Sequence, residues 1–171
     1  MLSNAFLKMP KILLFLPFSL LFFAFTKKKT PIITLFRSKQ TRRGCDGGGC
    51  GNYGASRDNG TRKHEGLDIL CEVGGKVFAP FDTIVQREVK PYASDARFNG
   101  LQLFAKEKNI ILKIMYFKAL SHLVGQTIKA GALIGYAQNI SEKYGASVPP
   151  HLHIEIFKNG VQIDPEPYLF P

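Results

Sequence analysis

Apolar and polar residues alternate over short stretches along most of this 171-residue chain, which is the pattern of half-buried β-strands. Strands are predicted at residues 76–80, 83–89, 101–105 and 110–117. No stretch sustains the 3.6-residue apolar period of an amphipathic helix. The pattern therefore predicts an antiparallel all-β domain, a sandwich or a partly open barrel with long loops, over residues 44–171.

Turn residues separate these predicted strands. Residues 51–60, 91–100 and 139–150 combine Gly, Asn, Ser, Asp or Pro and are predicted to be long loops. Residues 106–109 join the strands on either side of them into a predicted hairpin. Between Gly125 and Gly135, glycines recur at turn-like intervals among apolar residues, as they do around the strands of a sandwich or a barrel.

The first 26 residues have the features of an export signal. Lys8 and Lys11 precede an apolar run at residues 12–25, which contains Pro17. A run of this length is too short for an ordinary membrane-spanning helix. We therefore predict a signal peptide over residues 1–26, no stable membrane span and a secreted, extracellular protein; an uncleaved anchor is the alternative.

The positive charge is concentrated at the N-terminus. The chain has a formal net charge of +10, but all 13 acidic residues lie after residue 43, where they nearly balance the remaining Lys and Arg. A nucleic-acid-binding module carries its positive charge on the folded domain itself, so this distribution argues against that class. Residues 27–43 are predicted to be a basic, flexible linker.

The three cysteines agree with export. Cys45 and Cys50 enclose a glycine-rich loop, because residues 47–49 are all glycine, and such a loop is easily closed by a disulfide. A zinc site at this pair is the alternative, although no second Cys or His pair lies nearby. Cys71 is left over, so it is predicted to be a buried thiol or to bond another molecule.

Two short blocks supply the groups that a divalent metal needs. His64 and Asp68 stand four residues apart, and His151 and His153 stand two apart, each pair within an apolar strand pattern. Side chains repeat every two residues in a strand, so each pair is predicted to point one way, and two adjacent strands would converge on one ion. Zinc takes imidazole nitrogen and carboxylate oxygen readily. The competing interpretation is a set of ordinary surface or hydrogen-bonded histidines.

These blocks occur with others in an order that resembles a known family. The sequence contains, in order, His64-x-Gly66-x-Asp68, the glycine-spaced segment 125–135, His151-x-His153-Ile-Glu and Asp164-Pro165. Together they resemble the lysostaphin-type, LytM-like zinc endopeptidases of bacterial cell walls. The Cys45–Cys50 loop and Lys90-Pro91-Tyr92 further resemble the chemotaxin-2-like branch of secreted animal proteins within that superfamily.

The resemblance implies the fold of the lysostaphin-type peptidases and a specific set of site residues. Zinc would be held by His64, Asp68 and His153. His151 matches a catalytic histidine, which in the peptidases assists the zinc-bound water, and it is our candidate catalytic residue.

The resemblance also implies a missing group. The peptidases carry a second catalytic histidine two residues after a tyrosine at a strand end, and here Tyr116 is followed at that place by Lys118. A lysine is cationic near neutral pH and offers no acceptor nitrogen, so it cannot replace an imidazole. If residues 120–122 are aligned with the Tyr-x-His pattern instead, His122 would be the second catalytic histidine. The alternative is that His122 is a solvent-facing loop residue.

Two functions remain open from the sequence. The first is a secreted zinc-containing signalling or immune protein with an inactive peptidase-like site, whose surface binds a cell-surface receptor or a glycan. The second is a secreted zinc metalloendopeptidase that binds bacterial cell wall and hydrolyses the peptide cross-bridges of peptidoglycan. The lysine at position 118 favours the first function.

Overall fold

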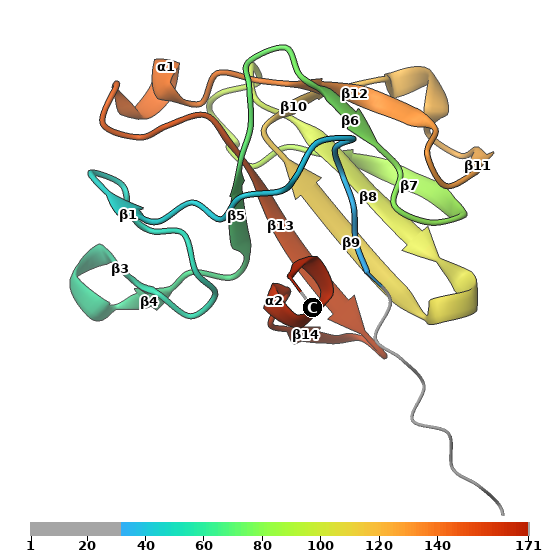
Figure 1. The fold of residues 1–171 in the computed structure, drawn as a ribbon, viewed down its shortest axis with the longest axis horizontal. Helices are drawn as coiled ribbons and strands as arrows, with labels where there is room; N and C mark the ends of the chain where they lie inside the picture. Colours follow the sequence, from blue (N-terminus) through green and yellow to red (C-terminus); the bar gives the residue numbers. More distant parts are fainter. Residues whose placement is uncertain (1–31, 171) are drawn as a thin grey trace, which may run out of the picture.

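The structure is a computed structural model that describes residues 32–170, and it consists mainly of short β-strands (Figure 1). The strands are β1 (Cys45–Asp46), β2 (Gly49–Cys50), β3 (Ser56–Arg57), β4 (Arg62–Lys63), β5 (Leu67–Leu70), β6 (Lys76–Phe78), β7 (Thr83–Val89), β8 (Gly100–Ala105), β9 (Ile110–Met115), β10 (Phe117–Ala119), β11 (Thr127–Ile128), β12 (Leu133–Ala137), β13 (His151–Lys158) and β14 (Val161–Ile163). The helices are α1 (Ser141–Tyr144) and α2 (Glu166–Leu169), each a single turn, as expected for a sequence without a helical period.

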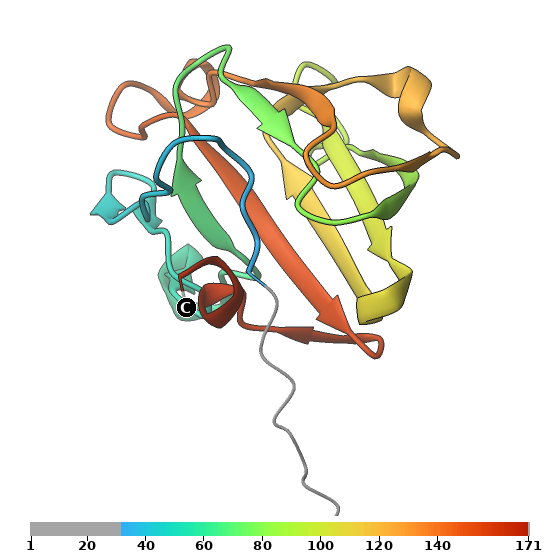
Figure 2. The ribbon, with the colours of Figure 1, turned by 45° about the vertical axis from the view of Figure 1, so that its right-hand side comes forward.

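Two main sheets carry the fold, and their strand pairs are all antiparallel. The larger sheet has the order β11-β7-β8-β9-β13-β14, with β5 beside β13, and the smaller has the order β10-β12-β6. Figures 1 and 2 show the smaller sheet against the upper end of the larger one. Neither order closes on itself among residues 32–170, so the predicted antiparallel β-fold is confirmed as two packed sheets rather than a closed barrel.

The most apolar predicted strand, residues 110–117, is divided between the two sheets. β9 ends at Met115 and belongs to the larger sheet, whereas β10 begins at Phe117 and belongs to the smaller. Tyr116 between them has a φ of +70°, in the left-handed region that interrupts a strand. The chain therefore changes sheets at this residue, which places the tyrosine ring beside the ends of both sheets.

The hydrophobic core lies between the sheets. Every second residue of β13 points into it: Leu152, Ile154 and Ile156 are fully buried there, and they meet apolar residues of β8 and β9 in the larger sheet and of β6 and β12 in the smaller. The residues between them, His151, His153 and Glu155, are also buried but on the opposite face. The two-residue period of a strand thus gives β13 one face for the core and one for a polar site.

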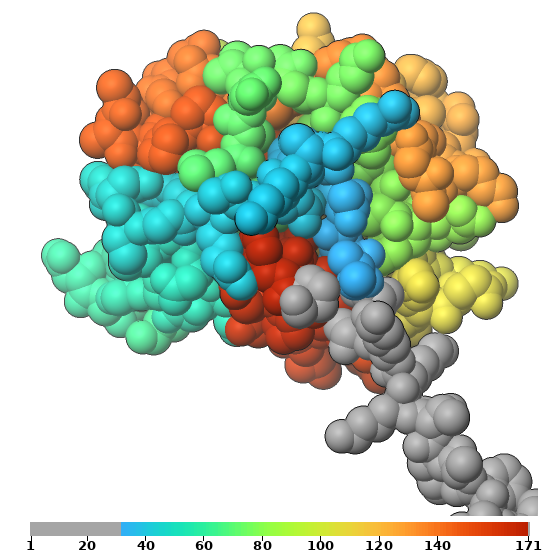
Figure 3. All heavy atoms as spheres, in the orientation of Figure 1, coloured from blue at the N-terminus to red at the C-terminus, as the bar shows by residue number. Residues whose placement is uncertain are grey.

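The predicted flexible linker is wrong for the part of it that the structure describes. Ile33 and Leu35 are fully buried members of the hydrophobic core. The Leu35 carbonyl accepts a hydrogen bond from the Phe78 amide of β6, and the Thr41 carbonyl accepts one from the Leu70 amide of β5. In Figure 3 this segment, in blue and cyan, crosses the face of the molecule. The alternation of Ile33 and Leu35 was the sequence signal for this packing.

The predicted signal peptide at residues 1–26 lies outside the described residues. Within residues 32–170, no helix is long and apolar enough to cross a membrane.

Candidate metal centre

Asp68 and His153 stand directly opposite each other on two paired strands. β5 pairs with the first half of β13 so that Asp68 faces His153 and Leu70 faces His151. The Nδ1 atom of His153 lies 2.9 Å from Oδ1 of Asp68. The predicted meeting of two adjacent strands is therefore what the structure shows, and the antiparallel register brings a carboxylate and an imidazole into contact.

His64 reaches the same point from a different direction than predicted. It precedes β5, in the connection from β4, so it does not share a strand with Asp68. Its Nδ1 donates a hydrogen bond to the Asn52 carbonyl over 2.9 Å, which turns Nε2 toward Asp68 and His153. A Cβ at Gly66 would lie against the Ile154 carbonyl and 2.6 Å from Nε2 of His153. The glycine is therefore what lets the His64 segment lie against β13.

The three donor atoms are spaced as ligands of one small ion. Nε2 of His64 lies 3.0 Å from Nδ1 of His153 and 3.3 Å from Oδ1 of Asp68, and all three residues are buried. With metal–ligand bonds near 2.05 Å, tetrahedral zinc ligands are about 3.3 Å apart. Two imidazoles and one carboxylate also match the three-ligand sets of zinc sites that keep a fourth position open. The residues present therefore fit a zinc ion.

Asp68 and His153 stabilise each other's charged forms. Burial alone would raise the pKa of Asp68, but its hydrogen bond with His153 and its contact with His64 outweigh that effect and hold the pKa well below its usual range. Burial likewise opposes a charge on His153, yet its hydrogen bond to Asp68 and the nearby Glu155 carboxylate raise its pKa to about 9. The same contacts that favour a proton on the imidazole favour a metal cation in its place.

His151 faces the cluster from the next inward position of β13. Its Nδ1 donates to the Pro149 carbonyl over 2.7 Å, so the lone pair of Nε2 points toward Asp68, 3.7 Å from Oδ2. Burial lowers the pKa of His151, which keeps the imidazole neutral. The ring packs edge-on against that of Tyr116, with centroids 5.4 Å apart. A neutral imidazole beside the cluster can accept a proton, which is the chemistry expected of the candidate catalytic residue.

The cluster lies at the bottom of a cleft of about 470 Å³. One wall is aromatic: the Tyr92 hydroxyl donates to that of Tyr116 over 2.9 Å and lies 2.8 Å from that of Tyr144. Arg57 and Arg62 also line the cleft. A larger groove of about 970 Å³ between residues 36–41 and β6 contains no histidine, so the candidate zinc ligands all lie in the smaller cleft.

The structure does not bring Lys118 or His122 into the cleft. Lys118 is exposed on β10, paired with the half-exposed Tyr136 of β12, and neither residue lines the cleft. His122 is exposed in a single 3-10 turn at residues 121–123. Lys118, at the place where the resemblance implies a second catalytic histidine, therefore does not enter the cleft, and neither does His122 of the alternative register.

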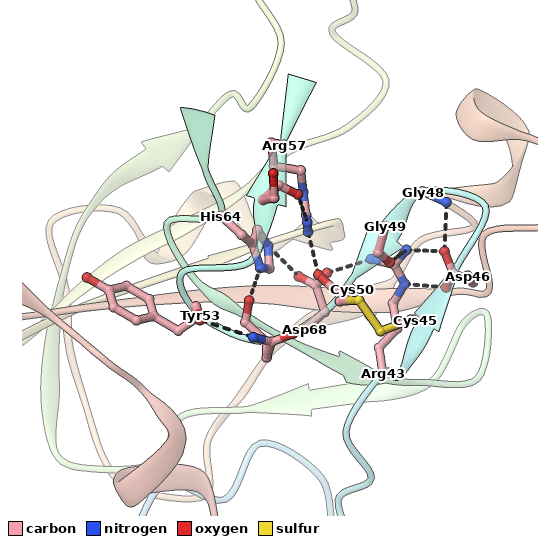
Figure 4. Close-up of a disulfide and its surroundings, with 12 residues drawn as sticks. Arg43, Cys45, Asp46, Gly48, Gly49, Cys50, Tyr53, Arg57, His64 and Asp68 are labelled. Carbon is pink, nitrogen blue, oxygen red and sulfur yellow. Dashed lines mark hydrogen bonds and ion pairs between the residues drawn. A yellow bond between two sulfur atoms is a disulfide. The ribbon is translucent and has the colours of Figure 1, made fainter. Parts of the chain in front are cut away.

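The predicted disulfide is present. Cys45 and Cys50 are bonded to each other (Figure 4). Cys71 is a free, half-buried thiol, as the odd cysteine count indicated. The disulfide closes a two-stranded hairpin of β1 and β2. The structure therefore assigns the Cys45–Cys50 pair to a covalent bond rather than to a second metal site.

Sequence patterns missed two buried partners of the cluster. Arg43 had been assigned to a linker, but its guanidinium is buried and donates to Oδ2 of Asp68 over 2.7 Å. Glu155 approaches Nε2 of His153 at 3.6 Å and accepts a hydrogen bond from Lys113. Strand alternation puts Glu155 on the same face as His153, so the sequence could have identified Glu155 as a partner of the cluster. No local sequence pattern identifies Arg43 as one.

Two antiparallel sheets, with Asp68 and His153 on paired strands and His64 beside them, define a metallopeptidase-type β-domain. Residues 62–165 match Peptidase family M23, and the chain belongs to that family. Leukocyte cell-derived chemotaxin-2 of Bos taurus is 33% identical over 139 residues, or 81% of this chain and 85% of the bovine protein. The protein of the same name from Mus musculus is 33% identical over 134 residues, or 78% and 82%.

Solved structures give the same family. The catalytic domain of the antimicrobial peptidase lysostaphin from Staphylococcus simulans aligns with a TM-score of 0.53 at 25% identity. The alignment covers 70% of this chain and 90% of that domain. The predicted resemblance to lysostaphin-type peptidases and to chemotaxin-2 is therefore confirmed.

Proposed function

We propose that this protein is a secreted, zinc-binding signalling or immune protein, similar to leukocyte cell-derived chemotaxin-2, whose peptidase-like site does not catalyse hydrolysis. Zinc would be bound by His64, Asp68 and His153, and His151 would line the open side of the site. The spacing of the three donor atoms supports the metal, and membership of the M23 family agrees with it.

The observation that carries the inactive assignment is the distribution of the histidines. The sequence has four, and the cleft contains three of them, two as candidate ligands and one as a candidate base. The fourth, His122, is exposed outside the cleft, and the exposed Lys118 is outside it as well. Bound zinc would polarise a carbonyl and acidify water, but hydrolysis of an amide also needs a second group for the oxyanion or the leaving amine.

The rim of the cleft supports a binding role. Tyr144 is half exposed beside Tyr92, and Lys143 lies 4.2 Å from the centre of the Tyr92 ring. Arg57 and Arg62 line the same cleft. Tyrosine and arginine are the residues that most often dominate binding energy at protein interfaces. We propose that this rim contacts a cell-surface receptor or a glycan.

The disulfide supports export, since such bonds persist in oxidising compartments and are rare in the cytosol. An apolar run at residues 12–25 with Lys8 and Lys11 before it fits a signal peptide. The secreted location is part of the proposal and follows from these two features together.

The test measures zinc and hydrolysis on one sample. Protein purified without chelator is expected to contain one zinc per chain by elemental analysis, and EDTA is expected to lower its melting temperature because the metal binds only the folded state. The same sample is expected not to cleave glycine-rich cross-bridge peptides or cell walls, with the lysostaphin catalytic domain as positive control.

Two results would contradict the proposal. Protein without zinc after addition of stoichiometric metal would remove the metal assignment. Cleavage that is lost in a His151→Ala variant and in zinc-free protein would instead establish the endopeptidase. As a matched control, His122→Ala is expected to change neither zinc content nor cleavage, because His122 lies outside the cleft.

A further inference from the structure

The guanidinium of Arg43 is buried between the disulfide hairpin and the metal cluster. Its side chain is only 3% exposed, and it lies between two carboxylates, Asp46 on β1 and Asp68 on β5 (Figure 4). A buried arginine that joins two carboxylates is a fixed link, because its planar fork of donors matches each partner in one orientation. Arg43 thus connects the hairpin to the strand that carries the metal ligand.

On the metal side, Arg43 occupies one oxygen of Asp68. Its Nη1 donates to Oδ2 over 2.7 Å, whereas the imidazoles of His64 and His153 face Oδ1. One oxygen of the carboxylate is therefore held by the arginine and the other is turned toward the metal position. This arrangement restricts Asp68 to a single ligand oxygen and fixes the rotation of the carboxylate, which is what a four-coordinate site needs.

On the hairpin side, Arg43 makes three hydrogen bonds. Nε donates to Oδ2 of Asp46 over 2.7 Å, Nη2 donates to Oδ1 of Asp46, and Nη2 also donates to the Gly49 carbonyl over 3.1 Å. Asp46 and Gly49 pair with each other across the hairpin, next to the Cys45–Cys50 bond. The Asp46 carboxylate and the Gly49 carbonyl are therefore held at a fixed separation only while β1 and β2 remain paired.

Backbone hydrogen bonds also connect Arg43, the end of the disulfide hairpin and β5. The Arg43 amide donates to the Asp68 carbonyl, and the Asp68 amide donates to the Gly51 carbonyl, both over 2.9 Å. A Cβ at Gly51 would lie 2.6 Å from the Arg43 carbonyl and 3.1 Å from the Asp68 Cβ. The end of the hairpin thus packs against β5 without space for a side chain, so movement of the hairpin is transmitted to Asp68.

We infer that Arg43 is a positioning residue for the metal site, and that it makes the zinc affinity of Asp68 depend on the disulfide-closed hairpin. The inference rests on the proposed zinc site. The charge of Arg43 by itself would disfavour a nearby dication, so the inference requires that orienting Asp68 outweighs that repulsion. A purely structural arginine would lower stability when removed but would leave the metal affinity of the remaining folded protein unchanged.

The first measurement is the zinc affinity of folded protein by competition with a chelator of known affinity. Arg43→Met is expected to weaken zinc binding by about tenfold or more, as loss of partners behind a metal ligand typically does. Arg43→Lys keeps the positive charge but lacks the planar guanidinium. Its zinc affinity is expected to lie between that of the wild-type protein and that of Arg43→Met. Arg87→Met is the matched control, because Arg87 lies on β7, where its hydrogen bonds among the described residues go to the Glu88 carbonyl and to Gln102, and it does not line the cleft.

The second measurement tests the coupling. Replacing both hairpin cysteines, Cys45→Ser with Cys50→Ser, is expected to weaken zinc binding severalfold in the wild-type background and to have little further effect in Arg43→Met, because the two changes act through one link. Equal, additive losses in both backgrounds would overturn the inference, as would wild-type affinity in folded Arg43→Met. If wild-type protein binds no zinc, the proposed function fails first and the inference with it.

Discussion

The histidines of the cleft are oriented by different partners behind them. His64 and His151 each donate Nδ1–H to a backbone carbonyl, so each presents the lone pair of Nε2 to the cleft. His153 is reversed: Nε2 lies toward Glu155 and Nδ1 toward Asp68. Because these outer partners fix which nitrogen faces inward, the choice of ligand atom is decided by residues that do not touch the metal position.

Gly66 gives a residue-scale prediction about close packing. Gly66→Ala places a methyl group against the Ile154 carbonyl and the His153 ring. Overpacking of this kind is expected to destabilise the protein by about 1–3 kcal/mol, measured as the free energy of unfolding in urea. Gly44→Ala is the control, since a Cβ there meets nothing within 4 Å and is expected to be nearly neutral. Equal stabilities of the two variants would refute the packing argument.

Cys71 gives a second residue-scale prediction, about reactivity. Burial raises the pKa of the Cys71 thiol to about 12. At pH 8 only about one thiol in ten thousand would then be the reactive thiolate, against about one in four for an ordinary cysteine. Native protein is expected to react with iodoacetamide at least a hundredfold more slowly than protein unfolded in urea, followed by mass spectrometry. Comparable rates in the two states would show that the thiol is not protected.

At the scale of elements, β13 has two functions. One face contributes Leu152, Ile154 and Ile156 to the core, and the other contributes His151 and His153 to the cleft. The strand also pairs with β9 along one edge and with β5 and then β14 along the other. Its backbone is therefore restrained on both edges and both faces, which holds the imidazoles in position with little freedom to move.

A substitution on the core face of β13 tests this restraint. Ile154→Ala removes a fully buried side chain between the sheets and is expected to cost about 2–5 kcal/mol of unfolding free energy. Val161→Ala on the neighbouring β14 is the comparison, because Val161 is 65% exposed and its replacement is expected to change stability by less than about 0.5 kcal/mol. Both values come from denaturant titrations, and a loss below about 1 kcal/mol for Ile154→Ala would contradict a well-packed core at this strand.

At the scale of the whole molecule, the N-terminal segment joins the two sheets. Residues 32–43 hydrogen-bond to β6 of the smaller sheet through Leu35 and to β5 of the larger sheet through Thr41. The Gln40 side chain accepts from the Leu35 amide and donates to the Ile33 carbonyl, which holds the bend between these contacts. The segment ends at Arg43, whose side chain reaches Asp68 of the His/Asp/His cluster.

The prediction at this scale compares two adjacent residues of the segment. Leu35→Ala removes a fully buried side chain from the core and is expected to lower the free energy of unfolding by about 2–5 kcal/mol. Thr34→Ala changes the neighbouring exposed side chain and is expected to have an effect within about 0.5 kcal/mol. If the two variants are equally stable in thermal and urea unfolding, the segment does not pack as described.

Local patterns determined those features that depend on neighbouring residues. Strand period and turn residues predicted β7 at residues 83–89, the hairpin of β8 and β9, and the antiparallel β-fold, because side-chain alternation and turn formation are short-range properties. The Cys45–Cys50 bond followed from a five-residue separation across glycines. The same period placed His151 and His153 on one face of their strand.

Tertiary structure decided everything that depends on contacts between distant segments. Only the pairing of β5 with β13 sets Asp68 opposite His153, and only the approach of the β4–β5 connection brings in His64. The left-handed Tyr116 divides a continuous apolar stretch between two sheets, and this leaves Lys118 on the exposed surface. Arg43 looks like one more basic residue in the sequence. It joins the cluster only because the fold buries its guanidinium between the carboxylates of Asp46 and Asp68.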